Sequence, residues 1–161
     1  MNQSQPFHSD IALISSDEAF ERNAVASIRT TLPDAPIRCF NSWDDYDAVS
    51  LEQSFRITVI DWKSMATPEA YDRTPALVAE EWLAVNVPDE ELPYAVDWIE
   101  RGYAGMLSEH CNTDMLSKAI ESVHSGELWF TRAEMARAIK AIHASQPVVD
   151  LNKLAQDEAK G

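Results

Sequence analysis

Ile57-Thr58-Val59-Ile60, followed directly by Asp61, is a short and nearly continuous apolar run that ends in a carboxylate. Such a run is typical of a strand that is buried on both faces of a parallel sheet. Four further short apolar segments recur along the chain, at 11–14, 37–40, 82–85 and 104–107. We therefore expect five strands in one sheet.

Amphipathic patterns between these segments predict helices. The first helix is expected to begin at a cap formed by Ser16 or Asp17 and to run to about Leu32. Another begins at Thr67-Pro68 and should be short or broken, because Pro75 limits it. Further helices are predicted over 89–101, from 113 to about 125, and over 132–144.

Strands that alternate with helices predict an α/β fold with a parallel sheet. Five such units fit a flavodoxin-like sheet in the order 2-1-3-4-5 with helices on both faces, and the helix over 132–144 is an additional sixth helix. Binding sites in such folds gather at the carboxyl ends of the strands. Asp61 is expected at one of these ends.

The formal net charge of −14 argues against a broad nucleic-acid-binding face on this chain. The charge is unevenly spread, however. From Lys118 to Lys140, four basic residues stand against three acidic ones, which gives this window a net charge of +1. We expect it to attract a small anionic ligand rather than DNA.

The chain shows no sign of a membrane or secreted location. No apolar run approaches the roughly 20 residues that a membrane-spanning helix requires, and the N-terminus does not have the pattern of a signal peptide. Cys39 and Cys111 lie far apart beside apolar runs, and we interpret them as reduced, partly buried thiols of a cytoplasmic protein. The four histidines show no spacing typical of metal ligands or of a catalytic triad, so neither a metal site nor an enzyme is expected: His8, His110, His124 and His143.

The tetrapeptide Trp129-Phe130-Thr131-Arg132 has the side chains of a nucleotide clamp. An aromatic plane stacks on a base, typically for about 1–3 kcal/mol, and arginine binds phosphate oxygens or a guanine edge in bidentate fashion. Thr131 and Glu134 form a T-x-x-E capping box that puts Thr131 at a helix N-terminus, where anions bind readily. The alternative is structural: the aromatic pair anchors the helix, the threonine only caps it, and the arginine is a solvated charge.

The sequence resembles bacterial response-regulator receiver domains at two places. Asp61 stands where receivers place their phosphoacceptor, and the segment 102–107, Gly-Tyr-Ala-Gly-Met-Leu, looks like the glycine-flanked entry into the fifth receiver strand. The segment 126–132, Gly-Glu-Leu-Trp-Phe-Thr-Arg, matches a W-[FLM]-[TS]-R signature. Over residues 10 to about 145 the chain looks most like LuxR/FixJ-class biofilm transcription regulators of the VpsT and CsgD type.

This resemblance implies a ligand, a dimer and a domain plan. The ligand would be cyclic di-GMP, bound by Trp129, Phe130, Thr131 and Arg132 with a contribution from Lys118. A homodimer linked to the ligand would form through the sixth helix, on which Met135, Ile139 and Ile142 make an apolar stripe that could also dock to its own domain. DNA would be contacted only by a C-terminal helix-turn-helix domain that these residues do not include.

The implied domain boundaries follow the same plan. Residues 1–9 are expected to be an N-terminal tail and residues 10–127 the receiver-like domain. Residues 128–145 hold the ligand motif and the sixth helix, and residues 146–161 are a linker toward the DNA-binding domain.

The chain departs from receivers at the positions that support phosphorylation. Receivers have an acidic pair after strand one, a Ser or Thr after strand four and a Lys after strand five, and Mg²⁺ is held by oxygen ligands. Here Ser16, with Asp17 one step beyond, Asn86 and Glu109 stand at these places. We therefore interpret Asp61 as a vestigial phosphoacceptor capped by backbone donors and expect no Mg²⁺ site, although Asp17 could restore part of one.

The leading hypothesis is a non-catalytic sensory domain of a biofilm-type transcription regulator that binds cyclic di-GMP and dimerises. One alternative is a phosphorylatable receiver that uses Asp61 with Asp17. A second is a ligand-free pseudo-receiver that acts through protein–protein contacts.

Overall fold

A computed structural model describes residues 11–75 and 80–145 of the chain. Five parallel strands form one sheet in the order β2-β1-β3-β4-β5, which confirms the predicted flavodoxin-like fold class. The strands are β1 (Ile11–Ile14), β2 (Ile37–Phe40), β3 (Ile57–Asp61), β4 (Glu81–Val87) and β5 (Gly105–Ser108). The predicted tail over 1–9 and the predicted linker over 146–161 lie outside the described residues.

Six α-helices and two 3₁₀ helices connect or follow the strands in the described residues. They are α1 (Glu18–Thr31), α2 (Trp43–Ser50), α3 (Trp62–Met65), η1 (Pro68–Asp72), η2 (Asp89–Tyr94), α4 (Ala95–Glu100), α5 (Thr113–His124) and α6 (Arg132–Ser145). The predictions for α1, α5 and α6 are confirmed to within one or two residues. The helix predicted to begin at Thr67-Pro68 is the short 3₁₀ helix η1, in agreement with a short segment, whereas α3 before it was not predicted.

The prediction of one helix over 89–101 is wrong. The segment is a 3₁₀ helix, with Pro93 inside it, followed by the short helix α4. Proline has no N–H to donate, so it removes a bond that a continuous α-helix would need. Gly102 ends the segment with a positive φ of 97°, a conformation that glycine commonly adopts after a helix C-terminus. Helix α2 was not predicted individually. Its start has a local signal, however, because Ser42 caps it by accepting a hydrogen bond from Asp45 N.

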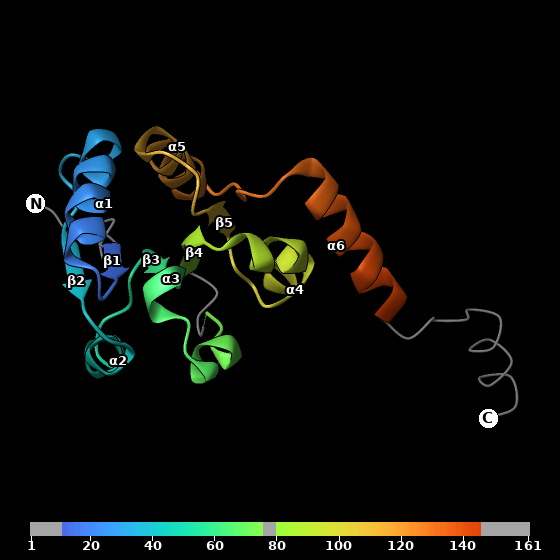
Figure 1. Ribbon diagram of the computed structural model, residues 1–161, viewed down its shortest axis with the longest axis horizontal. Helices are drawn as coiled ribbons and strands as arrows, with labels where there is room; N and C mark the ends of the chain where they lie inside the picture. The colour runs from blue at the N-terminus through green and yellow to red at the C-terminus, as the bar shows by residue number, and fades with distance from the viewer. Residues whose placement is uncertain (1–10, 76–79, 146–161) are drawn as a thin grey trace, which may run out of the picture.

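Helices α1 and α5 cover one face of the sheet, and α2, α3 and α4 cover the other (Figure 1). Successive strand residues point to opposite faces, so Ile11 and Leu13 join the α1/α5 side while Ala12 and Ile14 join the other. The α1/α5 side is mainly aliphatic. The opposite side is rich in aromatic rings, including four of the five tryptophans: Trp43, Trp62, Trp82 and Trp98.

Helix α6 packs against α4 at the side of the molecule and leads away from the sheet (Figure 1). Its buried residue is Ala138, which is 1% exposed. Of the predicted apolar stripe, Met135 is half-buried, whereas Ile139 and Ile142 are 61% and 38% exposed. The stripe is therefore divided: Met135 lies near the buried Ala138 on the inner side of α6, whereas Ile139 is directed away from it.

Both cysteines are exposed as whole residues, so the interpretation of partly buried thiols is wrong for Cys111, whereas the Cys39 thiol is still partly desolvated by its surroundings. Cys39 lies on β2, the strand at one edge of the sheet, where the helices leave the strand partly open to solvent. None of the helices in the described part of the chain combines the length and the apolar character needed to span a membrane.

Candidate functional site

Asp61 lies at the carboxyl end of β3 and is completely buried. Its Oδ2 accepts hydrogen bonds from Ser15 Oγ at 2.7 Å and from Ser64 Oγ at 2.8 Å. Its Oδ1 accepts one from Asn86 Nδ2 at 2.9 Å. Neutral side chains, and not the expected backbone donors, therefore cap both oxygens of this carboxylate.

Asn86 reaches Asp61 through an irregular backbone. Its φ is +57°, and the pairing of β4 with β5 shifts register between Ala84 and Val87. Asparagine tolerates this left-handed conformation better than most residues. Irregular strands and strained backbones of this kind often re-aim a side chain, and here the amide lies on the buried carboxylate.

The residues that follow β1 are used for local structure. The Ser16 N–H donates to Ser64 Oγ at 3.1 Å. Asp17 caps α1, since its Oδ1 accepts from Ala19 N at 3.0 Å and from Phe20 N at 3.1 Å. The carboxylate of Asp17 is thus directed to the start of α1, and no hydrogen bond joins it to Asp61 among the interactions of the described residues.

Glu109 follows β5, and its carboxylate pairs with a lysine from another element. Lys63 Nζ of α3 lies 3.3 Å from Glu109 Oε1. The Glu109 N–H donates to Val87 O at 2.8 Å, which ties the ends of β4 and β5 together. A cation is therefore present near this edge of the sheet, but it neutralises Glu109 and does not reach Asp61.

Trp129 extends the sheet beyond β5, and Phe130 follows it. The Trp129 N–H donates to Ala104 O at 2.7 Å, and Trp129 O accepts from Met106 N at 3.2 Å, which makes a parallel bridge with Gly105. Trp129 packs against the aliphatic cluster and Phe130 against the aromatic one, on opposite faces of the sheet. Both residues are half-buried, so the pair anchors the chain between α5 and α6.

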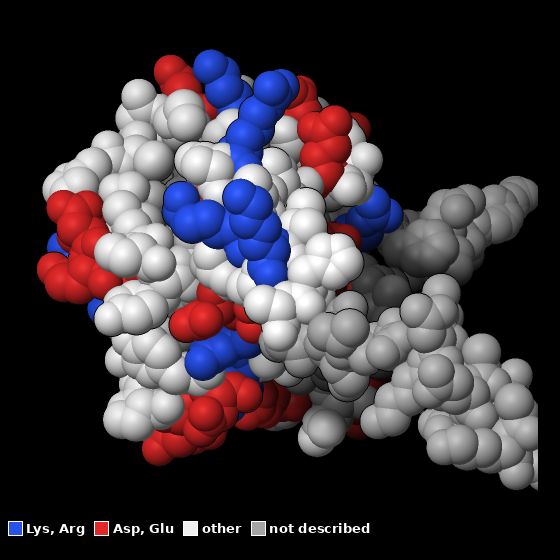
Figure 2. Space-filling model, turned by 90° about the vertical axis from the view of Figure 1, so that its right-hand side faces the viewer, with Lys and Arg blue, Asp and Glu red and all other residues white. Residues whose placement is uncertain are grey.

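Thr131 and Glu134 form the predicted capping box at the start of α6. Glu134 Oε1 accepts from Thr131 N at 2.8 Å, and Thr131 Oγ1 accepts from Glu134 N at 3.0 Å. Arg132, the first residue of α6, and Lys118 of α5 are both exposed. Figure 2 shows Lys and Arg side chains gathered on the side of the molecule where α6 lies, with acidic side chains around them.

Three solved structures share this architecture. A LuxR family DNA-binding response regulator from Silicibacter pomeroyi is 10% identical, with 78% of this chain and 98% of that chain covered and a TM-score of 0.58. The regulatory domain of the master biofilm regulator CsgD is 14% identical, with 81% and 98% covered and a TM-score of 0.60. The chain has a receiver-like fold. A third structure, RcsB from Salmonella enterica serovar Typhimurium bound to a promoter in the presence of a phosphomimetic, is 11% identical, with 85% and 69% covered and a TM-score of 0.60.

The sequence itself matches no protein-family model and no curated protein. The receiver-like fold therefore rests on three-dimensional similarity, and the side chains at the carboxyl ends of the strands have to be judged by their own chemistry.

The structure also adds residues that sequence reasoning missed. Ser15 and Ser64 are partners of Asp61, and Ser15 could have been found because it directly follows β1, whose end meets the end of β3. Asp89, Glu109 and His110 converge at the ends of β4 and β5, although no ligand spacing in the sequence links them.

Proposed function

We propose that this receiver-like domain is a non-catalytic regulatory domain that acts by binding and not by phosphorylation of Asp61. The observation that carries the proposal is the environment of that carboxylate. It is completely buried, and Ser15, Ser64 and Asn86 donate to both of its oxygens. Attack on a phosphoryl donor requires an accessible oxygen, and these three hydrogen bonds would first have to break.

The surrounding side chains also fit Mg²⁺ poorly. This hard ion favours carboxylate and water oxygens in octahedral geometry. Asp17, the acidic side chain that could have restored part of a metal site, is engaged as the cap of α1. We therefore infer that Mg²⁺ is not a cofactor at Asp61.

We further propose cyclic di-GMP as the ligand of the Trp129–Arg132 motif. Arg132 is exposed at the start of α6, where its guanidinium can bind a phosphate or a guanine edge. The half-buried Trp129 packs on the cluster to which α5 contributes, and Lys118 is exposed on that same helix. Arg132 and Lys118 would supply the charge, Trp129 a stacking plane, and Phe130 and Thr131 the support that holds α6 in place.

Dimerisation through α6 and control of biofilm-type genes complete the proposal. The fold is shared with the CsgD regulatory domain and with DNA-binding regulators, which favours a role in a transcription regulator. The chain's own charge of −14 disfavours direct contact with DNA, so we assign that contact to a separate helix-turn-helix domain of the regulator.

One observation favours the ligand-free pseudo-receiver as the second candidate. Three members of the motif already have structural contacts. Trp129 forms the bridge with β5, Phe130 packs against the aromatic cluster, and Thr131 belongs to the capping box. In addition, the Glu134 carboxylate lies at the start of α6, where it would repel a phosphate. Only Arg132 would then need a separate explanation.

Calorimetry with cyclic di-GMP distinguishes the two candidates. We expect the intact chain to bind the ligand and Arg132→Ala to bind at least tenfold more weakly. Arg137→Ala, an exposed arginine of the same helix, is the matched control and should bind within a factor of about three of the intact chain. No heat of binding at tens of micromolar ligand would exclude the ligand and leave the pseudo-receiver, whereas equal binding by Arg132→Ala would exclude the site.

Incubation with acetyl phosphate tests the proposal for Asp61. We expect no Mg²⁺-dependent increase in the intact mass of the chain. Phosphorylation that disappears in Asp61→Asn would establish the phosphorylatable receiver instead.

A further inference from the structure

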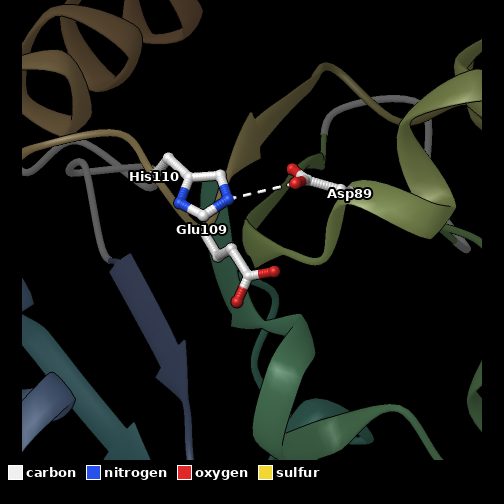
Figure 3. Close-up of side chains that lie close together, drawn as sticks. All are labelled: Asp89, Glu109 and His110. Carbon is white, nitrogen blue, oxygen red and sulfur yellow. Dashed lines mark hydrogen bonds and ion pairs between the residues drawn. The ribbon is translucent and has the colours of Figure 1, made fainter.

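Asp89, Glu109 and His110 come together at the ends of two neighbouring strands. Asp89 begins η2, two residues after β4, while Glu109 and His110 directly follow β5. One ligand atom of each side chain lies within 4.8 Å of those of the other two. Figure 3 shows the His110 ring turned toward Asp89, with Glu109 beside them.

The backbone holds the two segments in this arrangement. Val87 pairs with Ser108 in the sheet, and the Glu109 N–H donates to Val87 O at 2.8 Å. The His110 N–H donates to Ser108 Oγ at 3.0 Å, which fixes the turn that carries both ligands from β5. His110 Nε2 lies 3.1 Å from Asp89 Oδ2, so the two segments already meet through their side chains.

We propose that Asp89, Glu109 and His110 form a binding site for a divalent transition-metal ion of the Zn²⁺ class. One imidazole nitrogen and two carboxylate oxygens are ligands that Zn²⁺ accepts, and three protein ligands leave a coordination position for water. An imidazole disfavours Mg²⁺ and Ca²⁺, which prefer oxygen ligands. The site is independent of the cyclic di-GMP proposal, because it shares no residue with the Trp129–Arg132 motif.

The proposed site requires the three ligand atoms to move closer together than they are now. Metal–ligand bonds of about 2.0–2.2 Å put tetrahedral ligand atoms about 3.4 Å apart. The present separations of up to 4.8 Å are longer, but Asp89 and His110 are exposed and can change rotamer. An ion would replace the present contact between His110 and Asp89 by two bonds to the metal.

Lys63 is the group that competes with the ion. Its Nζ lies 3.3 Å from Glu109 Oε1, and its side chain is 61% exposed, so the ammonium can swing into solvent when a metal binds. The lysine end of this ion pair is exposed, whereas the Glu109 side chain is only 21% exposed, so the competition comes from a single mobile ammonium. With the imidazole neutral, the three ligands carry two negative charges within a chain of net charge −14, and both facts favour a cation.

Zn²⁺ titrated into the chelator-treated full chain, followed by calorimetry, tests the site. We expect one ion per chain and an increase in melting temperature, because the ion joins η2 to the segment after β5. His110→Ala and Glu109→Gln should each weaken binding at least tenfold. His143→Ala, an exposed histidine on α6, should bind as the intact chain does.

Lys63→Ala distinguishes the proposed site from adventitious binding of Zn²⁺ to a surface histidine, because only the proposed site includes Glu109. Because it frees Glu109, it should strengthen Zn²⁺ binding by a factor of about three or more. Mg²⁺ in tenfold excess should not displace the bound Zn²⁺. Absence of stoichiometric binding by the intact chain, or equal loss in His110→Ala and His143→Ala, would overturn the proposal.

Discussion

Asp61 shows how a single buried carboxylate can connect separate segments of a sheet edge. Its donors come from three places: Ser15 after β1, Ser64 on α3 and Asn86 on β4. A buried charge is costly unless hydrogen bonds replace the lost water, and hydrogen bonds to charged groups are stronger than neutral ones. The network therefore stabilises the edge at which a receiver would carry out phosphotransfer.

Replacement of Asp61 should be costly for this reason. Asp61→Ala removes the carboxylate that accepts from three donors and leaves the Asn86 amide without this acceptor, and we expect a loss of about 2–4 kcal/mol in the free energy of unfolding. Asp61→Asn should cost less, since the hydroxyls of Ser15 and Ser64 can rotate to suit an amide. Urea denaturation measures the free energy of unfolding of both variants. Asp34 is exposed, so Asp34→Ala is the control, and its free energy of unfolding should lie within about 0.5 kcal/mol of that of the intact chain. Equal stability of Asp61→Ala and the intact chain would contradict the role of the network.

A second prediction for a single residue concerns the pH dependence of alkylation at Cys39. Partial burial of the thiol, with a further contribution from the Glu21 carboxylate, raises the pKa of Cys39 to about 11, although the residue as a whole is exposed. The thiolate is the reactive form of cysteine. At pH values below this pKa, the thiolate fraction increases about tenfold with each unit by which the pH rises. In a Cys111→Ser background, alkylation should therefore accelerate steadily from pH 7 to pH 10.

Glu21→Gln removes the negative charge that disfavours the thiolate of Cys39. The pKa of Cys39 should fall, and alkylation at pH 8 should become faster than in the Cys111→Ser parent. A rate that levels off below pH 9 in that parent would show that the pKa of Cys39 is not raised.

At the scale of elements, Gly105 explains how the segment before α6 joins the sheet. A Cβ on Gly105 would lie 2.6 Å from Leu83 Cδ1 and 2.7 Å from Trp129 Cβ. Both distances are shorter than van der Waals contact, so only glycine lets Trp129 approach β5 closely enough for the bridge. The start of α6 is therefore positioned by a strand-like contact as well as by its capping box.

Gly105→Ala should push this segment away from β5. We expect a loss of about 1–3 kcal/mol in the free energy of unfolding, as for other overpacked sites, and faster hydrogen exchange at the Trp129 N–H. Thr131→Ala is the comparison, because it removes the cap of α6 for about 1 kcal/mol but leaves the bridge intact. If the Trp129 amide kept its full protection in Gly105→Ala, the close approach would not be essential.

At the scale of the whole molecule, α6 has two different sides. Ala138 faces α4 and is buried, whereas Ile139 is one of the exposed large apolar residues in the described part of the chain. An exposed isoleucine is ordinary in itself. On a helix proposed to form a ligand-linked dimer, however, it is the residue on which a second copy would be expected to pack.

Ile139→Lys tests this proposal. Because Ile139 is 61% exposed, the stability of the monomer should change by no more than about 0.5 kcal/mol. Light scattering with cyclic di-GMP present should show dimer formation weakened at least tenfold. Ala144→Lys adds the same charge on another side of α6 and serves as the control. A dimer that forms equally well in both variants would place the interface elsewhere.

Local sequence features were sufficient for much of this architecture. Apolar runs placed the strands, and Asp17 and the Thr131/Glu134 box marked where α1 and α6 begin, because strand burial and helix capping depend on residues close in sequence. The alternation of strands and helices predicted a parallel sheet, and five such units fitted the order 2-1-3-4-5 that the structure has. The break at η2 was not predicted, because the 3.6-residue pattern alone does not show where the Pro93 ring interrupts the helix.

Only the tertiary structure decided what the side chains at the sheet edge do. Ser15 and Asn86 lie 46 and 25 positions from Asp61, and Asp89 lies 21 from His110. Likewise, the Trp129 bridge to Gly105 turned two candidate ligand residues into anchors of the sheet. Such contacts depend on which strands are neighbours and on the register between them, and these are fixed only when the whole sheet assembles.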